Sequence, residues 1–540
     1  MSTAAMIHNP VLPGFNPDPS FCRVGDDFYI ATSTFEWYPG VQIHRSRDLV
    51  NWTLVTRPLN RKSQLDMRGN PDSCGIWAPC LSYADGRFWL VYTDVKRFEG
   101  NFKDAHNYIV TAPSIEGPWS DPVYVNSSGF DPSLFHDDDG RKWFINMLWN
   151  HRTGSIGGQP KAPAFDGILL QQWDAASGKL VGPVSNIYKG TSLGLVEGPH
   201  LFKRKGWYYL MTAEGGTGYG HAVTLARSRT LHGPYETHPN LHVVSSKDAP
   251  EAPLQRAGHG QVVELEDGST YLAHLCGRPL PGTRRSPRGR ETAIQKCVWG
   301  DDDWLYLAHG GMVPAVDVPA PFAGIEPRPR EAVRRSFVHC PALPPEFQWL
   351  RTPEPDRLFR LTGDALRLTG RESVGSWFEQ SLVARRQEDA SLRAETTLAS
   401  FSPDTYQQAA GLAHYYNRHK FHALVVTWQD GSGRVLSILS CPGDWPDNRL
   451  QFPLAEPVVL PAEGPVRLAA DIDGPQLQFF ADWGQGWQPV GPVLDASVIS
   501  DEGGRGEHGS FTGAFIGMLA FDTSGAARTA DFTSFDYLPR

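Results

Sequence analysis

Three acidic residues, Asp18, Asp131 and Glu197, precede aromatic segments of the chain at nearly constant distances. Several carboxylates around one pocket suit the cleavage of a glycosidic bond. One carboxyl must be protonated to give a proton to the leaving oxygen, and another must be ionised to activate water or attack carbon. Crowding of like charges raises one pKa, hydrogen bonding lowers another, and a third carboxylate can set the difference. The three acids therefore predict glycosidase chemistry if the fold brings them together.

A repeat in the sequence defines these distances. Five aromatic strand segments, each preceded by a polar turn, recur every 54 to 66 residues within the first 275 residues. Spacing of this order suits one four-stranded sheet per repeat and predicts a five-bladed β-propeller. The aromatic anchors of the five segments are Tyr29, Trp89, Trp143, Tyr209 and Tyr271.

Counting back 11 or 12 residues from each anchor gives one equivalent position per blade. These positions are occupied by Asp18, Ala78, Asp131, Glu197 and His259. The innermost strands of a propeller converge on a central channel, so equivalent positions become neighbours in space. Each acid alone is equally explained as a turn residue, because Asp-Pro pairs favour turns, and His259 as a core histidine. Three acids in register favour the shared site.

Composition limits the other classes of function. The 540 residues are 40% apolar and include 17 Trp, which supports packed cores in more than one domain. The net charge of −9, with acids and bases interspersed, indicates neither nucleic acid nor a membrane surface as partner. The N-terminus lacks a basic and apolar signal pattern, and no stretch has the ~20 apolar residues of a membrane span. Together with seven scattered cysteines, which suit a reducing compartment, this predicts a cytoplasmic protein.

The chain divides at a proline-rich segment. Residues 1–312 are predicted to form the catalytic propeller, and residues 313–332 an extended linker. Residues 333–540 show short alternating segments between Gly, Pro and Asp turns, which predicts a C-terminal β-sandwich of jelly-roll, lectin-like type. The fold class is therefore all-β.

Several residues outside the acidic register have two interpretations. Trp77, next to Ala78, is expected to face the pocket because aromatic rings offer flat apolar faces to sugars. Arg290 alone is a solvated loop charge. Phe511 stands in a glycine-rich segment of the second domain, where a sandwich core residue is the alternative.

The motifs around these residues resemble glycoside hydrolase family 43, most closely its two-domain β-xylosidases. The resemblance extends over nearly the whole chain, with further matches at residues 407–412 and 511–515. The motifs that carry it are Phe15-Asn16-Pro17-Asp18-Pro19-Ser20, Ile76-Trp77-Ala78-Pro79, Phe130-Asp131-Pro132-Ser133, Val196-Glu197-Gly198-Pro199-His200 and Gly289-Arg290-Glu291-Thr292-Ala293.

The resemblance implies an inverting enzyme that releases xylose from the non-reducing ends of short β-1,4-xylooligosaccharides, with activity on α-L-arabinofuranosides as a side reaction. It implies that Asp18 is the general base, Glu197 the general acid, and Asp131 the residue that orients Glu197 and tunes its pKa. It further implies that Phe511 closes one side of the pocket. The residues that it places around the sugar are Phe35, Trp77, Ala78, Trp149, Thr217, His259, Arg290 and Phe511.

Some points stay open at this stage. The alternatives are an enzyme acting mainly on α-L-arabinofuranosides and a non-catalytic sugar-binding propeller. No cofactor is expected to be required, although some similar enzymes hold a hydrated calcium ion near the residue that matches His259. Similar enzymes lead us to expect a homo-oligomer, a dimer or a tetramer. Gly198 replaces an alanine common in the family, a change expected to matter little.

Overall fold

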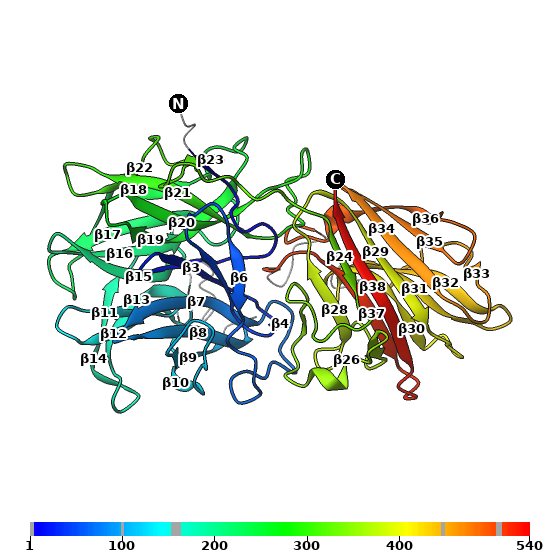
Figure 1. Ribbon diagram of the computed structural model, residues 1–540. Helices are drawn as coiled ribbons and strands as arrows, with labels where there is room; N and C mark the ends of the chain where they lie inside the picture. Colours follow the sequence, from blue (N-terminus) through cyan, green and yellow to red (C-terminus); the bar gives the residue numbers. More distant parts are fainter. Residues whose placement is uncertain (1–4, 99–101, 153–163, 444–448, 504–509) are drawn as a thin grey trace.

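The computed structural model describes residues 5–98, 102–152, 164–443, 449–503 and 510–540. Two β-rich lobes lie side by side, the N-terminal one coloured blue to green and the C-terminal one yellow to red (Figure 1). The helices among the described residues are single 3-10 turns such as Pro355–Arg357, and none of the described helices is long and apolar enough to span a membrane. The prediction of an all-β fold is confirmed.

The N-terminal lobe is a propeller built from four-stranded antiparallel sheets that follow one another in sequence. Each sheet contacts the next through its first strand, and the last contacts the first, which closes the ring. The sheets are β2 (Ser20–Val24), β3 (Asp27–Thr32), β5 (Gln42–Ser46) and β6 (Thr53–Thr56); β7 (Gly75–Ala84), β8 (Arg87–Arg97), β9 (Asp104–Ala112) and β10 (Val123–Asn126); β11 (Ser133–His136), β12 (Lys142–Trp149), β13 (Phe165–Asp174) and β14 (Lys179–Tyr188); β15 (Glu197–Arg204), β16 (Trp207–Glu214), β17 (Ala222–Ser228) and β18 (Glu236–Ser245); β19 (Gln255–Glu264), β20 (Thr270–Gly277), β21 (Glu291–Trp299) and β22 (Leu305–Leu307).

The polar pairs ahead of the aromatic anchors form tight turns inside the blades. Asp85 and Gly86 join β7 to β8 with φ angles of 54° and 70°, and Lys205 and Gly206 join β15 to β16 with 47° and 75°. A two-residue turn with positive φ at both positions matches the twist of the strands that it joins. These turns fix the first strand of a blade against the second and thereby place the channel residues.

The segment after the last blade packs against the propeller. Strand β23 (Asp317–Pro319) pairs with the N-terminal strand β1 (Met6–His8), and the side chain of Asn9 donates to the carbonyl oxygens of Ile294 and Ala315. Further along, the backbone N–H of Arg328 donates to Asn51. The predicted linker at 313–332 is thus in part a strand of the N-terminal lobe. Proline spacing indicated its extended shape but carried no information on the strand that it joins.

The C-terminal lobe is a sandwich of two antiparallel sheets. An eight-stranded sheet has the order β26-β27-β38-β29-β34-β35-β36, with β24 also paired to β38, and a six-stranded sheet has the order β28-β37-β30-β31-β32-β33. The strands are β24 (Val333–Ser336), β26 (Phe359–Leu361), β27 (Leu366–Thr369), β28 (Ser381–Arg386), β29 (Ser391–Ser400), β30 (Gln408–Asn417), β31 (Lys420–Gln429), β32 (Gly433–Pro442), β33 (Val458–Val459), β34 (Val466–Asp473), β35 (Gln476–Asp482), β36 (Gln488–Asp495), β37 (Phe515–Asp522) and β38 (Thr529–Pro539).

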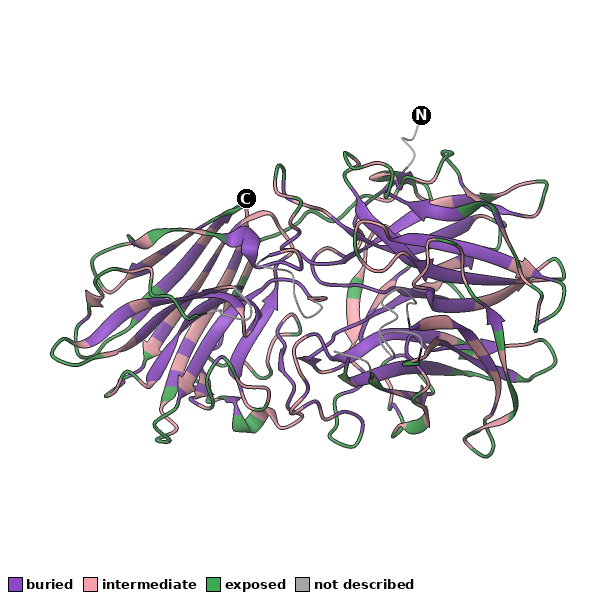
Figure 2. Ribbon diagram, turned by 180° about the vertical axis from the view of Figure 1, so that it is seen from behind, coloured by how far each residue is buried: buried purple, intermediate pink, exposed green. Residues whose placement is uncertain are grey.

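The two sheets of the sandwich differ in what covers their outer faces. Strand β29 alternates between half-buried and buried residues, as expected of a sheet with one face in the core, whereas every residue of β30 is buried (Figure 2). The outer face of β30 contacts the propeller, where Tyr415 lies 6.3 Å from Trp37, centroid to centroid. Trp37 also stacks on Phe515 of β37 at 3.6 Å. A large apolar contact of this kind holds two lobes in one arrangement.

Candidate active site

A pocket of about 240 Å³ lies at the centre of the propeller on the side that meets the sandwich. It collects the three predicted acids and most of the predicted sugar-binding residues. Its lining comprises Asp18, Phe35, Trp77, Phe98, Lys103, Phe130, Asp131, Phe165, Leu195, Glu197, Gly216, Thr217, His259, Arg290 and Phe511.

One backbone feature marks the equivalent position in each blade. The cross-strand partners of the five aromatic anchors are Cys22, Ser82, Phe135, Phe202 and Val263. The residue four positions before each partner has a positive φ. These residues are Asp18 (55°), Ala78 (32°), Asp131 (53°), Gly198 (56°) and His259 (47°). The first strands therefore share a left-handed kink where they enter the channel.

The register predicted for the fourth blade is wrong by one residue. Gly198, not Glu197, holds the position equivalent to Asp18 and Asp131, because the distance from anchor to kink varies between blades. Glycine also has a steric reason there, since a Cβ on Gly198 would lie 2.9 Å from the ring of His259. An alanine would be strained by both φ and contact, so the expectation that this position matters little is also wrong. Glu197 approaches the pocket from the residue before the kink.

Asp18 is held as a carboxylate. Its Oδ1 accepts from Arg290 at 2.9 Å and its Oδ2 from the hydroxyl of Ser33 at 2.7 Å. The hydroxyl of Ser33 in turn accepts from the backbone N–H of Ala78. Burial alone would raise the pKa of Asp18, but the charges of Arg290 and His259 and the Ser33 bond lower it below its ordinary value. Asp18 is consequently ionised at neutral pH and can accept a proton.

Glu197 and Asp131 behave in the opposite way. Burial and the charge of Asp18 raise the pKa of Glu197 to about 8, although Arg290 and Lys103 oppose the rise. Burial and the charges of Glu197 and Asp18 raise the pKa of Asp131 well above its ordinary value. Asp131 also accepts from the backbone N–H of Gly198 at 3.1 Å, which ties it to the residue next to Glu197. The pocket thus holds protonated and ionised carboxyls side by side at neutral pH.

Arg290 connects the propeller chemistry to the sandwich. One terminal nitrogen donates to Asp18, and the other donates to the backbone carbonyl of Phe511 at 2.8 Å. Its guanidinium carbon lies 5.2 Å from the ring centroid of Phe35, and its side chain is only 2% exposed. The alternative of a solvated loop charge is therefore excluded.

The remaining wall of the pocket is aromatic. The ring of Trp77 lies 5.7 Å from Phe35, 5.6 Å from Phe98, 5.4 Å from Phe130 and 5.9 Å from Phe511, centroid to centroid. The sandwich-core alternative for Phe511 is excluded, because its ring lines the pocket. These rings form a continuous apolar wall of the kind that accepts the face of a sugar.

Three predicted contacts differ in kind from the expectation. Ala78 is not among the pocket lining and acts through its backbone N–H to Ser33. Trp149 lies behind the wall, against Phe165 and below the ammonium of Lys103 at 4.4 Å. Thr217 lines the pocket, and its carbonyl accepts from Arg256.

Sequence reasoning missed Lys103 and the rings of Phe98, Phe130 and Phe165. Lys103 donates to the carbonyl of Phe98, and burial lowers the pKa of its ammonium to about 8, although Glu197 raises it. These residues fall outside the five-fold register. Only the Phe130-Asp131 neighbourhood offered a signal for one of them.

A second layer of contacts fixes the wall. The backbone of Ser73, at φ 61°, donates to Glu36 and accepts from the indole of Trp77, while its hydroxyl accepts from the backbone N–H of Phe511. Arg256, which holds Thr217, forms ion pairs with Asp501 and Glu502 of the sandwich. Propeller and sandwich thus share the task of positioning the pocket.

His259 lies beside the acids, with its ring 6.1 Å from that of His200. Burial lowers its pKa, although the charge of Asp18 raises it. Among the described residues, no group of three or more His, Cys, Asp or Glu side chains is arranged to hold a metal ion. A calcium ion near His259 would thus have water rather than a set of side chains as its ligands.

Comparisons with known proteins agree with this geometry. Residues 7–305 match the family model described as glycosyl hydrolases family 43, and residues 335–538 match the β-xylosidase C-terminal concanavalin A-like domain. The chain is 60% identical to xylosidase/arabinosidase 43B of Humicola insolens over 99% of this chain and 98% of the relative, and 46% identical to a β-xylosidase of Bacillus subtilis over 98% and 99%. The crystal structure of a xylan β-1,4-xylosidase from Bacillus halodurans superposes with a TM-score of 0.93 at 50% identity and covers 98% of this chain and 100% of the other.

Proposed function

The chain belongs to glycosyl hydrolase family 43, and from this premise we propose that it is a β-xylosidase which removes D-xylose from the non-reducing ends of β-1,4-xylooligosaccharides. One observation carries the proposal: a carboxyl with a lowered pKa, Asp18, and one with a raised pKa, Glu197, line the same small pocket. A non-catalytic sugar-binding propeller has no need of such a pair.

The proposed reaction is a single displacement. Glu197, protonated at neutral pH, gives its proton to the glycosidic oxygen as the bond to the anomeric carbon breaks. Asp18 takes a proton from the water that attacks the same carbon from the opposite face. The products are xylose with inverted configuration and a shortened oligosaccharide, and the proton on Asp18 returns to Glu197 through solvent. No step involves a metal ion.

Asp131 is proposed to position Glu197 and to keep its pKa raised. Its bond to the N–H of Gly198 fixes the backbone that carries Glu197. A carboxyl so close to Glu197 disfavours a second negative charge, so ionisation of either group raises the pKa of the other. Arg290 is proposed to hold Asp18 in place and to bind sugar hydroxyls.

The size of the pocket supports cleavage at chain ends. Its volume of about 240 Å³ is below the roughly 300 to 1,000 Å³ of sites for drug-sized ligands and suits a single sugar unit. Phe511 and the aromatic wall close one side. An internal unit of a long polymer cannot enter such a closed site.

An enzyme acting mainly on α-L-arabinofuranosides is the second candidate, because the Humicola relative is named a xylosidase/arabinosidase. Side-by-side kinetics on 4-nitrophenyl β-D-xylopyranoside and α-L-arabinofuranoside distinguish the two. We expect a higher kcat/KM on the xyloside, and the reverse order would favour the second candidate.

Proton NMR during the hydrolysis of xylobiose tests the mechanism. We expect α-xylose as the first product, and β-xylose would refute the single displacement. Strong hydrolysis of xylobiose with little release from polymeric xylan is expected; comparable rates on both would refute cleavage at chain ends.

The cellular setting is also a proposal. The described chain has seven free cysteines, six of them buried, which fits a reducing cytoplasm that imports short oligosaccharides. We further propose a homo-oligomer, to be measured by sedimentation, and activity that survives dialysis against EDTA.

A further inference from the structure

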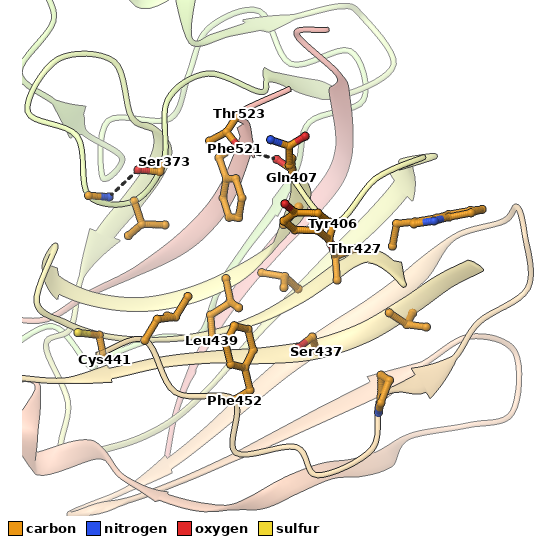
Figure 3. Close-up of a pocket in the computed structure, with 18 of the residues that line it drawn as sticks. Ser373, Tyr406, Gln407, Thr427, Ser437, Leu439, Cys441, Phe452, Phe521 and Thr523 are labelled. Atoms are coloured by element: carbon orange, nitrogen blue, oxygen red, sulfur yellow. Dashed lines mark hydrogen bonds between the residues drawn. The ribbon is translucent and has the colours of Figure 1, made fainter. Parts of the chain in front are cut away.

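A second cavity, of about 990 Å³, lies on the outer face of the six-stranded sheet of the sandwich (Figure 3). We call it the sandwich groove. In Figure 3, Tyr406, Gln407 and Phe521 approach it from one side, and Leu439 and Phe452 from the other. The residues that matter here are the floor residues Val425, Thr427, Ser437 and Leu439, the rings of Tyr406, Trp428 and Phe452, and the polar or charged Gln407, Arg418, Gln429 and Asp430.

The groove is the uncovered part of a sheet face that the propeller covers elsewhere. Floor residues Val425 and Ser437 are cross-strand partners, as are Thr427 and Val435, so they share one face of β31 and β32. The intervening residues face the core between the two sheets. On β30 and β37 the outer face is closed by the contact of Trp37 with the sandwich. The groove is thus continuous with the interface between the lobes.

Aromatic rings stand exposed along the groove. Tyr406 is 73% exposed and Phe452 is 61% exposed, values at which an apolar ring gains nothing from folding. Trp428 is half-buried, and its indole N–H donates to Asp430 at 3.2 Å. Rings held on both sides of a cavity offer flat faces to a ligand.

Hydrogen-bonding groups lie between these rings. Thr427 donates to the carbonyl of Gln408 and keeps its lone pairs for a further donor. The side chains of Gln407, Gln429 and Ser437 make no hydrogen bond with any other residue that the structure describes. A ligand rich in hydroxyls would satisfy these groups, whereas an apolar surface would leave them unpaired.

The charge of the groove is balanced. Arg418 is neutralised by an ion pair with Asp72 of the propeller at 3.0 Å. Asp430 lies exposed in the turn after β31. The lining therefore attracts neither a polyanion nor a polycation, and complements a neutral ligand.

We propose that the sandwich groove binds a neutral xylooligosaccharide chain as a second site, separate from the catalytic pocket. The identity of the sugar rests on the proposed function. Tyr406, Trp428 and Phe452 stack on the pyranose rings, and the amides and hydroxyls between them bind the sugar hydroxyls.

A second copy of the chain is a poorer occupant. Two identical concave surfaces facing each other across a two-fold axis cannot fill one another, and a head-to-tail contact would have to close into a ring or continue as a filament. A flexible oligosaccharide enters such a groove without these constraints.

The near end of the groove points toward the catalytic lobe. Asp72, the partner of Arg418, precedes Ser73, whose hydroxyl accepts from the backbone of Phe511. A chain held in the groove stays close to the lobe that cleaves it, which raises the effective concentration of long substrates at the pocket.

Calorimetric titration of xylohexaose into the full-length Asp18→Ala variant tests the proposal, because this background prevents hydrolysis. We expect two sites per chain. Adding Tyr406→Ala and Phe452→Ala should leave one site, with affinity at the other weakened about tenfold or more. Tyr124→Ala, which removes an equally exposed tyrosine from β10 of the propeller, is the matched control and should retain two sites.

Three results would decide against the groove as a sugar site. These are a single site in the parent variant, no change on removing both rings, and a change in assembly mass by sedimentation when the rings are removed, which would make the groove an interface between copies. Failure of the proposed function is recognised separately. It would appear as no turnover of an aryl xyloside by the unmodified chain, whereas two sites lost to one would still support the groove.

Discussion

The catalytic pocket of the propeller and the groove of the sandwich are both lined by β-strands but differ in what their backbones can deliver. In the propeller, left-handed kinks at equivalent positions point polar side chains such as Asp18 and Asp131 into one channel. In the sandwich, the regular alternation of β31 and β32 presents a row of apolar and small polar residues, and charges lie only at the margins. A ring of kinks concentrates charge, whereas an unbroken sheet spreads contacts along a surface.

The two regions are nevertheless coupled. Arg290 donates to Asp18 and to the carbonyl of Phe511, and Ser73 binds both Trp77 and the backbone of Phe511. The sandwich contributes shape and contacts to a pocket whose ionisable groups come from the propeller. Variants that separate charge from shape test this division.

The largest effect is expected from Asp18→Asn, which keeps the size of the side chain but removes the base. Loss of a positioned general base typically costs a factor of 10² to 10⁴, so kcat on 4-nitrophenyl β-D-xyloside should fall by about 10³. Asp536→Asn in β38, which breaks only an exposed ion pair with Arg334, is the sandwich counterpart and should leave kcat unchanged. Equal losses in both variants would end the division of labour.

A smaller effect is expected from Arg290→Lys, which retains the charge but cannot donate to Asp18 and Phe511 together. A planar fork is not replaced by a point charge, so kcat/KM should fall about 100-fold. The variant should lose more in kcat/KM than Arg334→Lys, an arginine of the sandwich surface. An unaltered kcat/KM would show that charge alone suffices at this position.

The sequence allowed much of this site to be predicted, and the misses have physical reasons. Asp18, Asp131 and Trp77 follow from the repeat because a propeller converts register into proximity. The offset of Gly198 did not follow, because a kink that absorbs one residue is invisible to counting. Lys103 enters from the start of β9, outside the repeat, and only the folded chain brings it over Trp149.

The next effect separates shape from charge. Phe511→Ala removes a ring that contacts Phe35, Trp77 and Phe98 but bears no charge. We expect KM on xylobiose to rise about tenfold with kcat changed by less, because apolar contact binds ground state and transition state alike. Phe378→Ala, an exposed ring of the same lobe, is the matched control. A kcat loss as large as that of Asp18→Asn would place chemistry in the sandwich.

The smallest expected effect concerns the pH at which activity is lost. Glu197 must be protonated to act as acid, so kcat/KM should fall as the pH rises through its pKa of about 8, and Asp18 should govern the acidic limb. The ammonium of Lys103 favours the ionised form of Glu197 and so lowers that pKa. Lys103→Met removes this charge, which should move the alkaline limb upward by roughly half a unit to one unit. The acidic limb should stay in place, because Lys103 is not among the charges that shift the pKa of Asp18. The position of each limb, rather than the height of the profile, is the measurement, since lost contacts with substrate change only the height. An alkaline limb that moved downward would mean that the group titrating there is not a carboxyl stabilised in its ionised form by Lys103, and Glu197 would lose its role as the acid.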